Sequence, residues 1–242
     1  MKISLIIPTL NEEKLLPNLL QSIEENNIKQ KYNAELIISD GGSLDNTISI
    51  ALSYADKIIA HDNPERQTIA EGKNLGAEVA SGDILFFLGS DVRFDNINNF
   101  FDFIVNDFAN SDYVAMTCQI RVFPEEEKLK DKIFHFFLNL YFYSLNIFKV
   151  GMGRGECQII RKEFFTEVGG FNPKLVAGED FDFFKRVRKK GKILFNWKLK
   201  IYESPRRYRR KGYLYVLYQW FINSVYLILY KRSKIDNWEE VR

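Results

Sequence analysis

The sequence predicts an α/β fold in which helices flank a mostly parallel sheet. One observation leads to this prediction, and a second suggests a function. In the N-terminal part, short apolar runs rich in β-branched residues alternate with longer runs whose apolar residues recur at helical spacing. Three of the apolar runs also end in polar, acidic or glycine residues, which read PTLNE, SDGGS and GSD and bear on a binding site. A strand–helix alternation of this kind is typical of parallel strands joined by right-handed crossovers.

The elements of this part can be placed in order along the chain. Strands are expected at residues 3–10, 34–40, 56–62 and 83–91, and helices at residues 11–27, 44–55 and 65–81. Asn11 is the expected N-cap of the first helix, which Pro17 would kink or delay. Asp45 lies near the start of the second helix, and the third tolerates Gly72 and Gly76.

The polar strand ends predict a binding site. In open α/β sheets, ligands bind beyond the carboxyl ends of the strands. Gly41 and Gly42 let the backbone turn sharply and approach a ligand closely, and Asp40 can accept hydrogen bonds from a base or a ribose. One such segment is equally consistent with an ordinary turn, but three strand ends of this kind in one sheet favour a shared site.

The composition limits the class of protein. With 242 residues, 46% of them hydrophobic, the chain can bury a core as one large domain or two small ones. A net charge of +2 gives no overall field that would indicate a nucleic-acid partner. Cys118 and Cys157 either fit a reducing compartment or carry no information about it, and a disulfide between them is the less favoured alternative. The N-terminal apolar run is too short for a signal peptide.

Two long uncharged runs rich in aromatic residues occupy the second half, at residues 133–148 and 212–230. The second run approaches the length of a membrane span, about 20 residues, and basic segments flank it. However, Gln219, Asn223 and Tyr226 share one helical face, and tyrosine prefers the membrane–water boundary. We therefore favour an amphipathic helix at a membrane interface, with a dimer or other protein–protein helix and a true span as the alternatives.

The chain resembles the inverting family-2 glycosyltransferases, which have the GT-A fold with a Rossmann-like N-terminal half. Four segments in order carry the resemblance, and they read PTLNEE, ISDGGSLDNT, GKNLGAEVASGDILFFLGSD and GED. They extend from about Lys2 to the region of Glu179, and the likeness continues to about Arg210. The resemblance implies transfer of a sugar from a nucleotide-diphosphate sugar to an acceptor hydroxyl or phosphate, lipid-linked acceptors included.

The resemblance also implies a set of nucleotide-binding residues. They are Pro8, Thr9, Asn11, Glu12, Asp40, Lys73 and Ser90. Asp40 would bind the base. Lys73 stands where the family usually has arginine, so a bidentate contact to the nucleotide is not expected there.

The end of the fourth predicted strand departs from the family pattern. The family usually carries Asp-any-Asp there, with one carboxylate on the ribose and the last on a divalent metal. This chain has Gly89, Ser90 and Asp91, so Asp91 is the implied ligand of Mg²⁺ or Mn²⁺. Such a cation often takes only one or two carboxylates beside phosphate oxygens. The alternative is that Asp91 only caps the strand end beside Arg93.

The family's Glu-Asp motif corresponds to Glu179 and Asp180. By resemblance, Asp180 is the catalytic base that takes the proton of the acceptor hydroxyl, with Glu179 and Asp182 in support. Carboxylates at the start of a helix are also favoured by the helix dipole, so simple capping is the alternative.

Further residues are implied on the acceptor or diphosphate side. They are Arg154, Glu179, Glu203, Arg206 and Arg207. Glu203 lies near the place where related enzymes supply a metal-ligating histidine, whereas His61 and His135 are expected to be structural or surface residues. The basic run at residues 206–211 can clamp a diphosphate, lie on anionic lipid or form a solvated loop.

Together these expectations describe a single GT-A domain spanning residues 1–242. Residues 1–95 would form the nucleotide-sugar-binding half, 96–211 the acceptor-binding half and 212–242 an amphipathic C-terminal helix. The alternatives to a glycosyltransferase are a non-catalytic nucleotide-sugar-binding partner subunit and a nucleotidyltransferase. The expected partners are a nucleotide-sugar donor, a glycan or lipid acceptor, the cytoplasmic face of a membrane and a second copy of the chain, but no nucleic acid.

Overall fold

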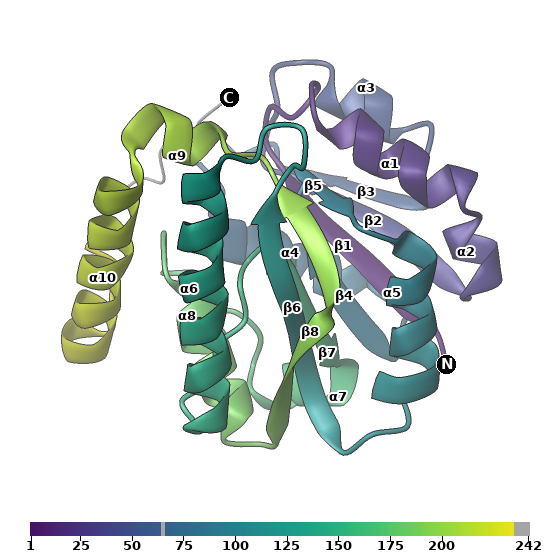
Figure 1. The fold of residues 1–242 in the computed structure, drawn as a ribbon. Helices are drawn as coiled ribbons and strands as arrows, with labels where there is room; N and C mark the ends of the chain where they lie inside the picture. The colour runs from purple at the N-terminus through teal and green to yellow at the C-terminus, as the bar shows by residue number, and fades with distance from the viewer. Residues whose placement is uncertain (64–65, 235–242) are drawn as a thin grey trace.

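The computed structural model describes residues 1–63 and 66–234. Within these residues, one mixed sheet forms the centre of the molecule, with its strands in the order β3-β2-β1-β4-β7-β6-β8-β5 (Figure 1). The strands are β1 (Ile3–Thr9), β2 (Ala34–Asp40), β3 (Lys57–Ala60), β4 (Ile84–Leu88), β5 (Val92–Phe94), β6 (Tyr113–Val122), β7 (Cys157–Arg161) and β8 (Lys192–Glu203). The α/β prediction is confirmed, and the four strands expected in the first half are all present.

Helices pack on both faces of this sheet. They are α1 (Leu16–Glu25), α2 (Ile28–Lys31), α3 (Thr47–Ala51), α4 (Ile69–Val79), α5 (Ile97–Phe103), a π-helical segment η1 (Ile104–Phe108), α6 (Leu129–Ile147), α7 (Lys162–Glu167), α8 (Glu179–Arg188), α9 (Arg206–Lys211) and α10 (Tyr213–Tyr230). Helices α1, α2, α3 and α5 contribute to the core on one face, and α4 and α8 to the core on the other. The result is a helix–sheet–helix layering (Figure 1).

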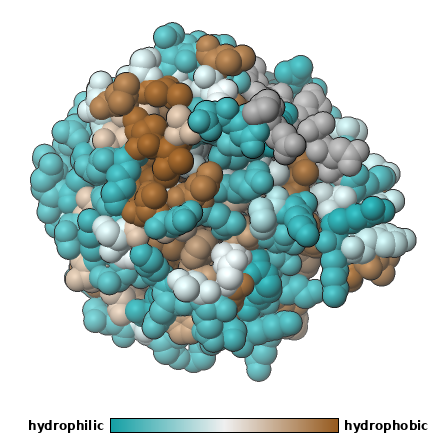
Figure 2. All heavy atoms as spheres, turned by 180° about the vertical axis from the view of Figure 1, so that it is seen from behind, coloured by the Kyte–Doolittle hydropathy of each residue, from teal (hydrophilic) through white to brown (hydrophobic). Residues whose placement is uncertain are grey.

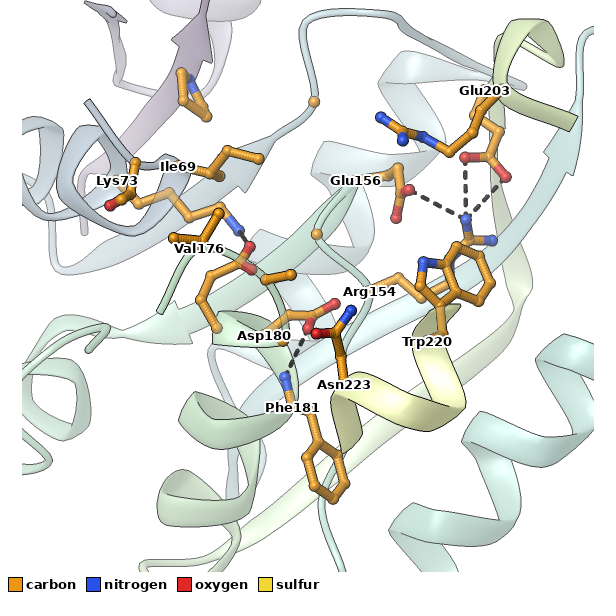
Figure 3. Close-up of a pocket in the computed structure, with 18 of the residues that line it drawn as sticks. Ile69, Lys73, Arg154, Glu156, Val176, Asp180, Phe181, Glu203, Trp220 and Asn223 are labelled. Atoms are coloured by element: carbon orange, nitrogen blue, oxygen red, sulfur yellow. Dashed lines mark hydrogen bonds and ion pairs between the residues drawn. The ribbon is translucent and has the colours of Figure 1, made fainter. Parts of the chain in front are cut away.

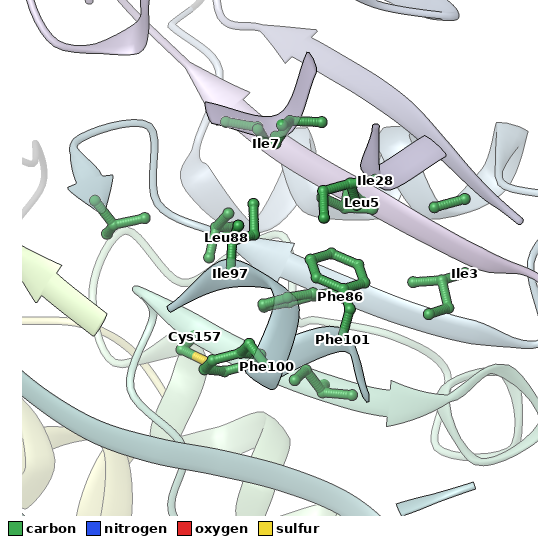
Figure 4. Close-up of a cluster of buried hydrophobic side chains, with 14 of the residues drawn as sticks. Ile3, Leu5, Ile7, Ile28, Phe86, Leu88, Ile97, Phe100, Phe101 and Cys157 are labelled. Atoms are coloured by element: carbon green, nitrogen blue, oxygen red, sulfur yellow. The ribbon is translucent and has the colours of Figure 1, made fainter. Parts of the chain in front are cut away.

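Strand β1 shows how one strand builds both cores. Leu5 and Ile6 are consecutive and fully buried. Leu5 belongs to the cluster that contains Phe86 and Phe100, whereas Ile6 belongs to the cluster that contains Phe87. Successive side chains of a strand point to opposite faces, so a sheet covered on both sides needs a nearly continuous apolar strand. Figure 4 shows the first cluster, in which the rings of Phe86 and Phe100 stack with centroids 5.6 Å apart.

The parallel prediction holds for the first half and only partly for the second. Strands β1, β2, β3 and β4 pair in parallel, and so do β6 and β8. Strand β7 runs antiparallel to β4 and β6, and β5 runs antiparallel to β8. As a result Leu88 lies opposite Cys157, and Val92 lies opposite Glu203. The start of β7 and the end of β8 therefore meet the carboxyl end of β4.

The predicted start of the first helix is wrong. Helix α1 begins at Leu16, because Pro17 fits the first turn of a helix, where its missing N–H is not needed. Asn11 is not its N-cap. Instead, Asn11 adopts a left-handed backbone conformation with φ of 53°, and its side chain accepts the N–H of Leu44 at 2.9 Å.

The next two helices are shorter than predicted. Helix α3 starts at Thr47, whose N–H donates to the Asp45 carboxylate at 2.9 Å. Helix α4 starts after Thr68, whose hydroxyl accepts the N–H of Glu71 at 3.1 Å, while the Glu71 carboxylate accepts the N–H of Thr68 at 2.7 Å. This reciprocal pair is a capping box, and it fixes the helix start. Residue 65, the predicted start, lies outside the described residues.

Helices α6 and α10 contain the two aromatic runs and lie side by side (Figure 1). Trp220 packs against the cluster of Leu138 and Phe142. At the N-terminal end of α6, buried Asp131 accepts hydrogen bonds from Arg209, at 2.8 Å, and from Tyr213. In the part of the chain that the structure describes, no helix is long and apolar enough to cross a membrane. Residues 235–242 of the predicted C-terminal segment lie outside that part.

Candidate active site

The sheet edge described above opens into a cavity of about 920 Å³. It lies beyond β1 and β4, and the loop before β7, the start of α8 and helices α6, α9 and α10 complete its walls (Figure 3). Most of the predicted site residues line it, namely Pro8, Thr9, Glu12, Lys73, Ser90, Asp91, Arg154, Glu179, Asp180, Glu203, Arg206 and Arg207. Asn11 and Asp40 are not among the described residues that line it.

Asp40 supports the wall of the cavity from behind. It is fully buried, and its carboxylate accepts the N–H groups of Gly42, at 3.0 Å, and Ser43, at 2.7 Å. The same carboxylate accepts the hydroxyls of Thr9 and Ser43, at 2.9 and 2.6 Å. Gly42 has φ of 92°, a conformation that favours glycine. Asp40 therefore shapes the turn whose Gly41 reaches the cavity, and direct contact with a base stays a prediction.

A cluster of opposite charges occupies one end of the cavity. Arg206 Nη2 lies 2.6 Å from Glu12 Oε1 and 3.1 Å from Asp91 Oδ2. Burial raises the pKa of Asp91, and the charge of Arg206 opposes this. Two carboxylates from different strand ends thus converge on one cationic nitrogen, while Arg207 lines the cavity nearby.

The convergence of Glu12 and Asp91 on one nitrogen shows how well these residues suit a metal ion. Within the described ranges, no three His, Cys, Asp or Glu side chains gather into a complete metal site. Glu12 and Asp91 do offer two oxygen donors to one cation, and a magnesium-like ion usually takes its remaining ligands from phosphate and water. The residues therefore fit a cation that is held jointly by the protein and a bound diphosphate.

Arg154 forms a second charged cluster on the floor of the cavity. Its Nη2 donates to both carboxylate oxygens of Glu203, at 2.8 and 3.0 Å, and to Glu156 at 3.1 Å (Figure 3). Glu203, the predicted substitute for a metal-ligating histidine, is thus engaged in an ion pair. Behind it lies buried His135, edge-on to Tyr208. Burial and then the charge of Arg154 lower the pKa of His135 to about 3, so it is a neutral, structural residue.

Asp180 lies at the start of α8, beside a buried ion pair. Lys73 Nζ is 3.1 Å from Glu179 Oε1 and 3.0 Å from Gln158 Oε1, and it lies 4.7 Å from the centre of the Phe171 ring. Asp180 is half-buried, and burial followed by the charge of Glu179 raises its pKa to about 7. A carboxylate with this pKa can accept a proton near neutral pH.

Sequence reasoning missed other parts of the site. Gln158 fixes Lys73 from β7, but a lone glutamine inside a strand gives no signal of such a role. Asp182, expected to support the base, instead pairs with Arg186 at 2.8 Å. From α10, Trp220 and Asn223 point into the cavity near Arg154 and Asp180 (Figure 3). The aromatic content of this helix was a signal, but which face lines the cavity depends on packing.

The fold and the cavity together define a class of protein, an α/β protein with a charged pocket at the carboxyl ends of its strands. Residues 4–169 match the family model described as Glycosyl transferase family 2, and the chain belongs to that family. A 4,4'-diaponeurosporenoate glycosyltransferase of Staphylococcus haemolyticus is 35% identical over 115 residues, which are 46% of this chain and 29% of that protein. The chain therefore matches less than a third of that relative.

Solved structures show that the fold is that of the GT-A glycosyltransferases. A mannosyltransferase from Pyrobaculum calidifontis in complex with GDP-Man and Mn²⁺ has a TM-score of 0.65 at 18% identity, covering 92% of this chain and 64% of its own. Glucosyl-3-phosphoglycerate synthase from Mycobacterium tuberculosis, in complex with Mn²⁺, UDP and glucosyl-3-phosphoglycerate, has a TM-score of 0.64 at 19% identity. That likeness covers 94% of this chain and 78% of the synthase.

The role of Asp40 can be tested by the substitution Asp40→Ala. It removes the acceptor of four hydrogen bonds, so the turn at residues 41–43 should lose its shape and nucleoside diphosphates should bind at least about tenfold more weakly. Calorimetric titration with GDP and UDP measures this. Asp107→Asn, at an exposed acid far along the chain, is the control. Unchanged affinity for both nucleotides would remove Asp40 from any part in the site.

Proposed function

We propose that this chain is an inverting glycosyltransferase that uses a nucleotide-diphosphate sugar as donor. The observation that carries the proposal is the half-buried carboxylate of Asp180, whose pKa is raised to about 7, in the same cavity as a cluster of arginines. Family membership supports the reaction class. The proposal does not specify the base of the donor nucleotide. Binding experiments therefore use both GDP and UDP, because solved structures of the same fold contain GDP-Man or UDP.

In the proposed reaction, Asp180 accepts the proton of the acceptor hydroxyl. The acceptor oxygen forms a bond to the anomeric carbon of the sugar while the bond from that carbon to the diphosphate breaks. Attack from the side opposite the leaving group inverts the configuration. Negative charge grows on the departing diphosphate, so Arg206 and Arg207, which line the same cavity, would stabilise the transition state more than the ground state.

A divalent metal, Mg²⁺ or Mn²⁺, completes the proposed donor site. Asp91 and Glu12 would hold it, since their carboxylates already converge on one cationic group. When bound, such a cation neutralises charge on the diphosphate. Arg206, which pairs with both carboxylates, would then turn to the phosphate oxygens, for which its planar fork is well suited.

The decisive variant is Asp180→Asn. It removes the proton acceptor at nearly constant volume, so sugar transfer should fall by about 10²–10⁴-fold while the affinity for nucleoside diphosphate stays the same. In the wild type, kcat/KM should rise with pH through about 7, because the base works only when ionised. Glu179→Gln, which also breaks the buried pair with Lys73, should lower transfer less than Asp180→Asn does, and its apparent pKa should move to lower pH because a neighbouring negative charge has gone.

The outcome of this experiment also separates the alternatives. Transfer by Asp180→Asn within a few-fold of the wild type would exclude Asp180 as the base. Release of pyrophosphate instead of nucleoside diphosphate would identify a nucleotidyltransferase. Nucleotide binding with no turnover by the wild type, for any donor tested, would identify a non-catalytic binding subunit.

The metal proposal is tested with Asp91→Asn. Mn²⁺ should strengthen the binding of GDP or UDP to the wild type, and this gain should disappear in Asp91→Asn, because one of the two converging carboxylates has lost its charge. Titrations with Mn²⁺ and with EDTA measure the gain, and Asp95→Asn, four residues along the chain, is the matched control. If the wild type binds equally well in EDTA, arginine side chains hold the diphosphate without a metal.

We further propose that the outer face of α6 and α10 rests on the cytoplasmic surface of an anionic membrane. Large apolar side chains stand exposed on both helices, among them Phe137 (61%) and Ile147 (54%) on α6 and Leu214 (83%) and Leu229 (65%) on α10. Basic residues flank them at both ends of α10, in the segments 206–211 and 231–234. Figure 2, which shows the molecule from behind, has mostly hydrophilic residues and one contiguous hydrophobic patch at the upper left. Both buried cysteines are free, which fits a reducing compartment.

Sedimentation with anionic vesicles tests this surface. The double variant Leu214→Glu with Leu229→Glu should bind phosphatidylserine vesicles at least about tenfold more weakly than the wild type, because two apolar side chains are lost and two negative charges added. The double variant Leu44→Glu with Leu52→Glu makes the same change at exposed leucines elsewhere and should bind normally. A wild type that stays in solution at low salt but sediments as a dimer would show that the face is a dimer contact.

A further inference from the structure

The cavity has two ends of opposite character. One end contains the charged side chains already described. The other end is an arm between α6, α10 and the loop before α8, and nearly all of its wall is apolar. The arm is lined by Leu138, Tyr141, Phe142, Leu145, Val150, Met152, Val176, Phe181, Leu217, Trp220, Phe221, Val225 and Ile228.

The side chains of Asn223 and Ser224, which also line the cavity at α10, already make hydrogen bonds within the protein. Asn223 donates to the carbonyl of Gln219 at 3.0 Å and accepts the N–H of Lys234 at 3.1 Å. The hydroxyl of Ser224 donates to the carbonyl of Trp220 at 2.9 Å. The arm therefore gains little from a polar ligand and most from apolar surface that leaves water.

The arm is continuous with the position of the proposed base. Asp180 and Phe181 are consecutive residues at the start of α8, and both line the cavity. Phe181 also packs with Trp220 against the apolar cluster of α6. In Figure 3, Asp180 lies between Lys73, on the donor side, and Asn223 of α10. A molecule whose hydroxyl reaches Asp180 would have the rest of its length in the arm.

The cavity is large. Pockets that hold one small molecule measure about 300–1,000 Å³, and this cavity, at about 920 Å³, lies near the upper limit. Its lining combines charged side chains from the strand ends and α9 with apolar side chains from α6 and α10, so it offers binding surfaces of two kinds.

We propose that the arm between α6 and α10 binds the apolar portion of the acceptor, a hydrocarbon or aromatic tail that ends in a hydroxyl at Asp180. The proposal rests on the proposed function for the identity of the hydroxyl group, but tail binding itself needs no turnover. In this proposal, the inner face of α10 selects the acceptor, while its outer face contacts the membrane.

A series of 4-alkylphenols probes the arm directly. In calorimetric titrations of the full chain with saturating UDP or GDP, affinity should rise about three- to fourfold per methylene from 4-ethylphenol to 4-hexylphenol, the gain expected for burying each CH₂. Asp180→Asn should bind the series with the same slope. Affinity that is independent of chain length would overturn the proposal.

Matched variants on α10 distinguish the arm from the outer surface of the helix. Leu217→Glu places a charge on the cavity wall and should weaken 4-hexylphenol binding by at least about tenfold. Leu214→Glu makes the same change one turn earlier on the outer face, where the side chain is 83% exposed, and should bind within about twofold of the wild type. Equal effects of the two variants would contradict the proposal.

A second pair of variants on α10 tests the same point if Leu217→Glu does not fold. Ile228 lines the cavity and Leu229, the next residue, does not, so Ile228→Glu should lose affinity and Leu229→Glu should keep it. Thermal melting and UDP or GDP affinity report whether each variant is folded.

Affinity that depends on chain length, without any sugar transfer, would support binding in the arm and reject the proposed function. Transfer to 4-ethylphenol with a KM that does not fall for longer chains would support the function and reject the arm.

Discussion

The buried ion pair between Lys73 and Glu179 is the interaction on which the rest of the site depends. Lys73 is 1% exposed and comes from α4, Glu179 begins α8, and Gln158 of β7 completes the contact. A charge buried this deeply is tolerated only when paired, and removal of one partner typically costs about 3–5 kcal/mol. The pair therefore joins three elements from both halves of the chain at one point. Asp180 follows Glu179 directly, so its position is set by the same contact.

This pair also sets the proton affinity of Asp180. Burial and the negative charge of Glu179 raise its pKa, while the positive charge of Lys73 lowers it, and the balance lies near 7. A carboxylate in water has a pKa of about 4 and would be a weaker base. Lysine suits this position, since its compact ammonium can be surrounded by one carboxylate, one amide and one aromatic ring.

Elsewhere in the cavity, two arginines each form ion pairs with two carboxylates. Arg206 is shared by Glu12 and Asp91, and Arg154 by Glu156 and Glu203. Such networks keep several charges buried without a ligand, because each has a partner within the protein. In the proposed donor site, a diphosphate and a cation would enter by exchanging partners with these side chains, with little change in the net charge of the site. The apolar arm beside these networks has no such charges, and in the proposed function this contrast separates the donor side of the cavity from the acceptor side.

Much of this protein follows from local sequence. The apolar runs of β1, β2 and β4 and the polar residues after them predict a sheet with a site at its carboxyl edge, because strand alternation and crossover handedness act over short distances. The position of Glu179 and Asp180 at the start of a helix could also be predicted. Tertiary structure decided the rest. Asp40 turns inward to hold its own loop, Arg206 finds Asp91 across 115 residues, and α10 closes the cavity with one of its faces. These contacts join segments far apart in the chain, so they depend on how the antiparallel β7 and the two aromatic helices pack, which no local pattern encodes.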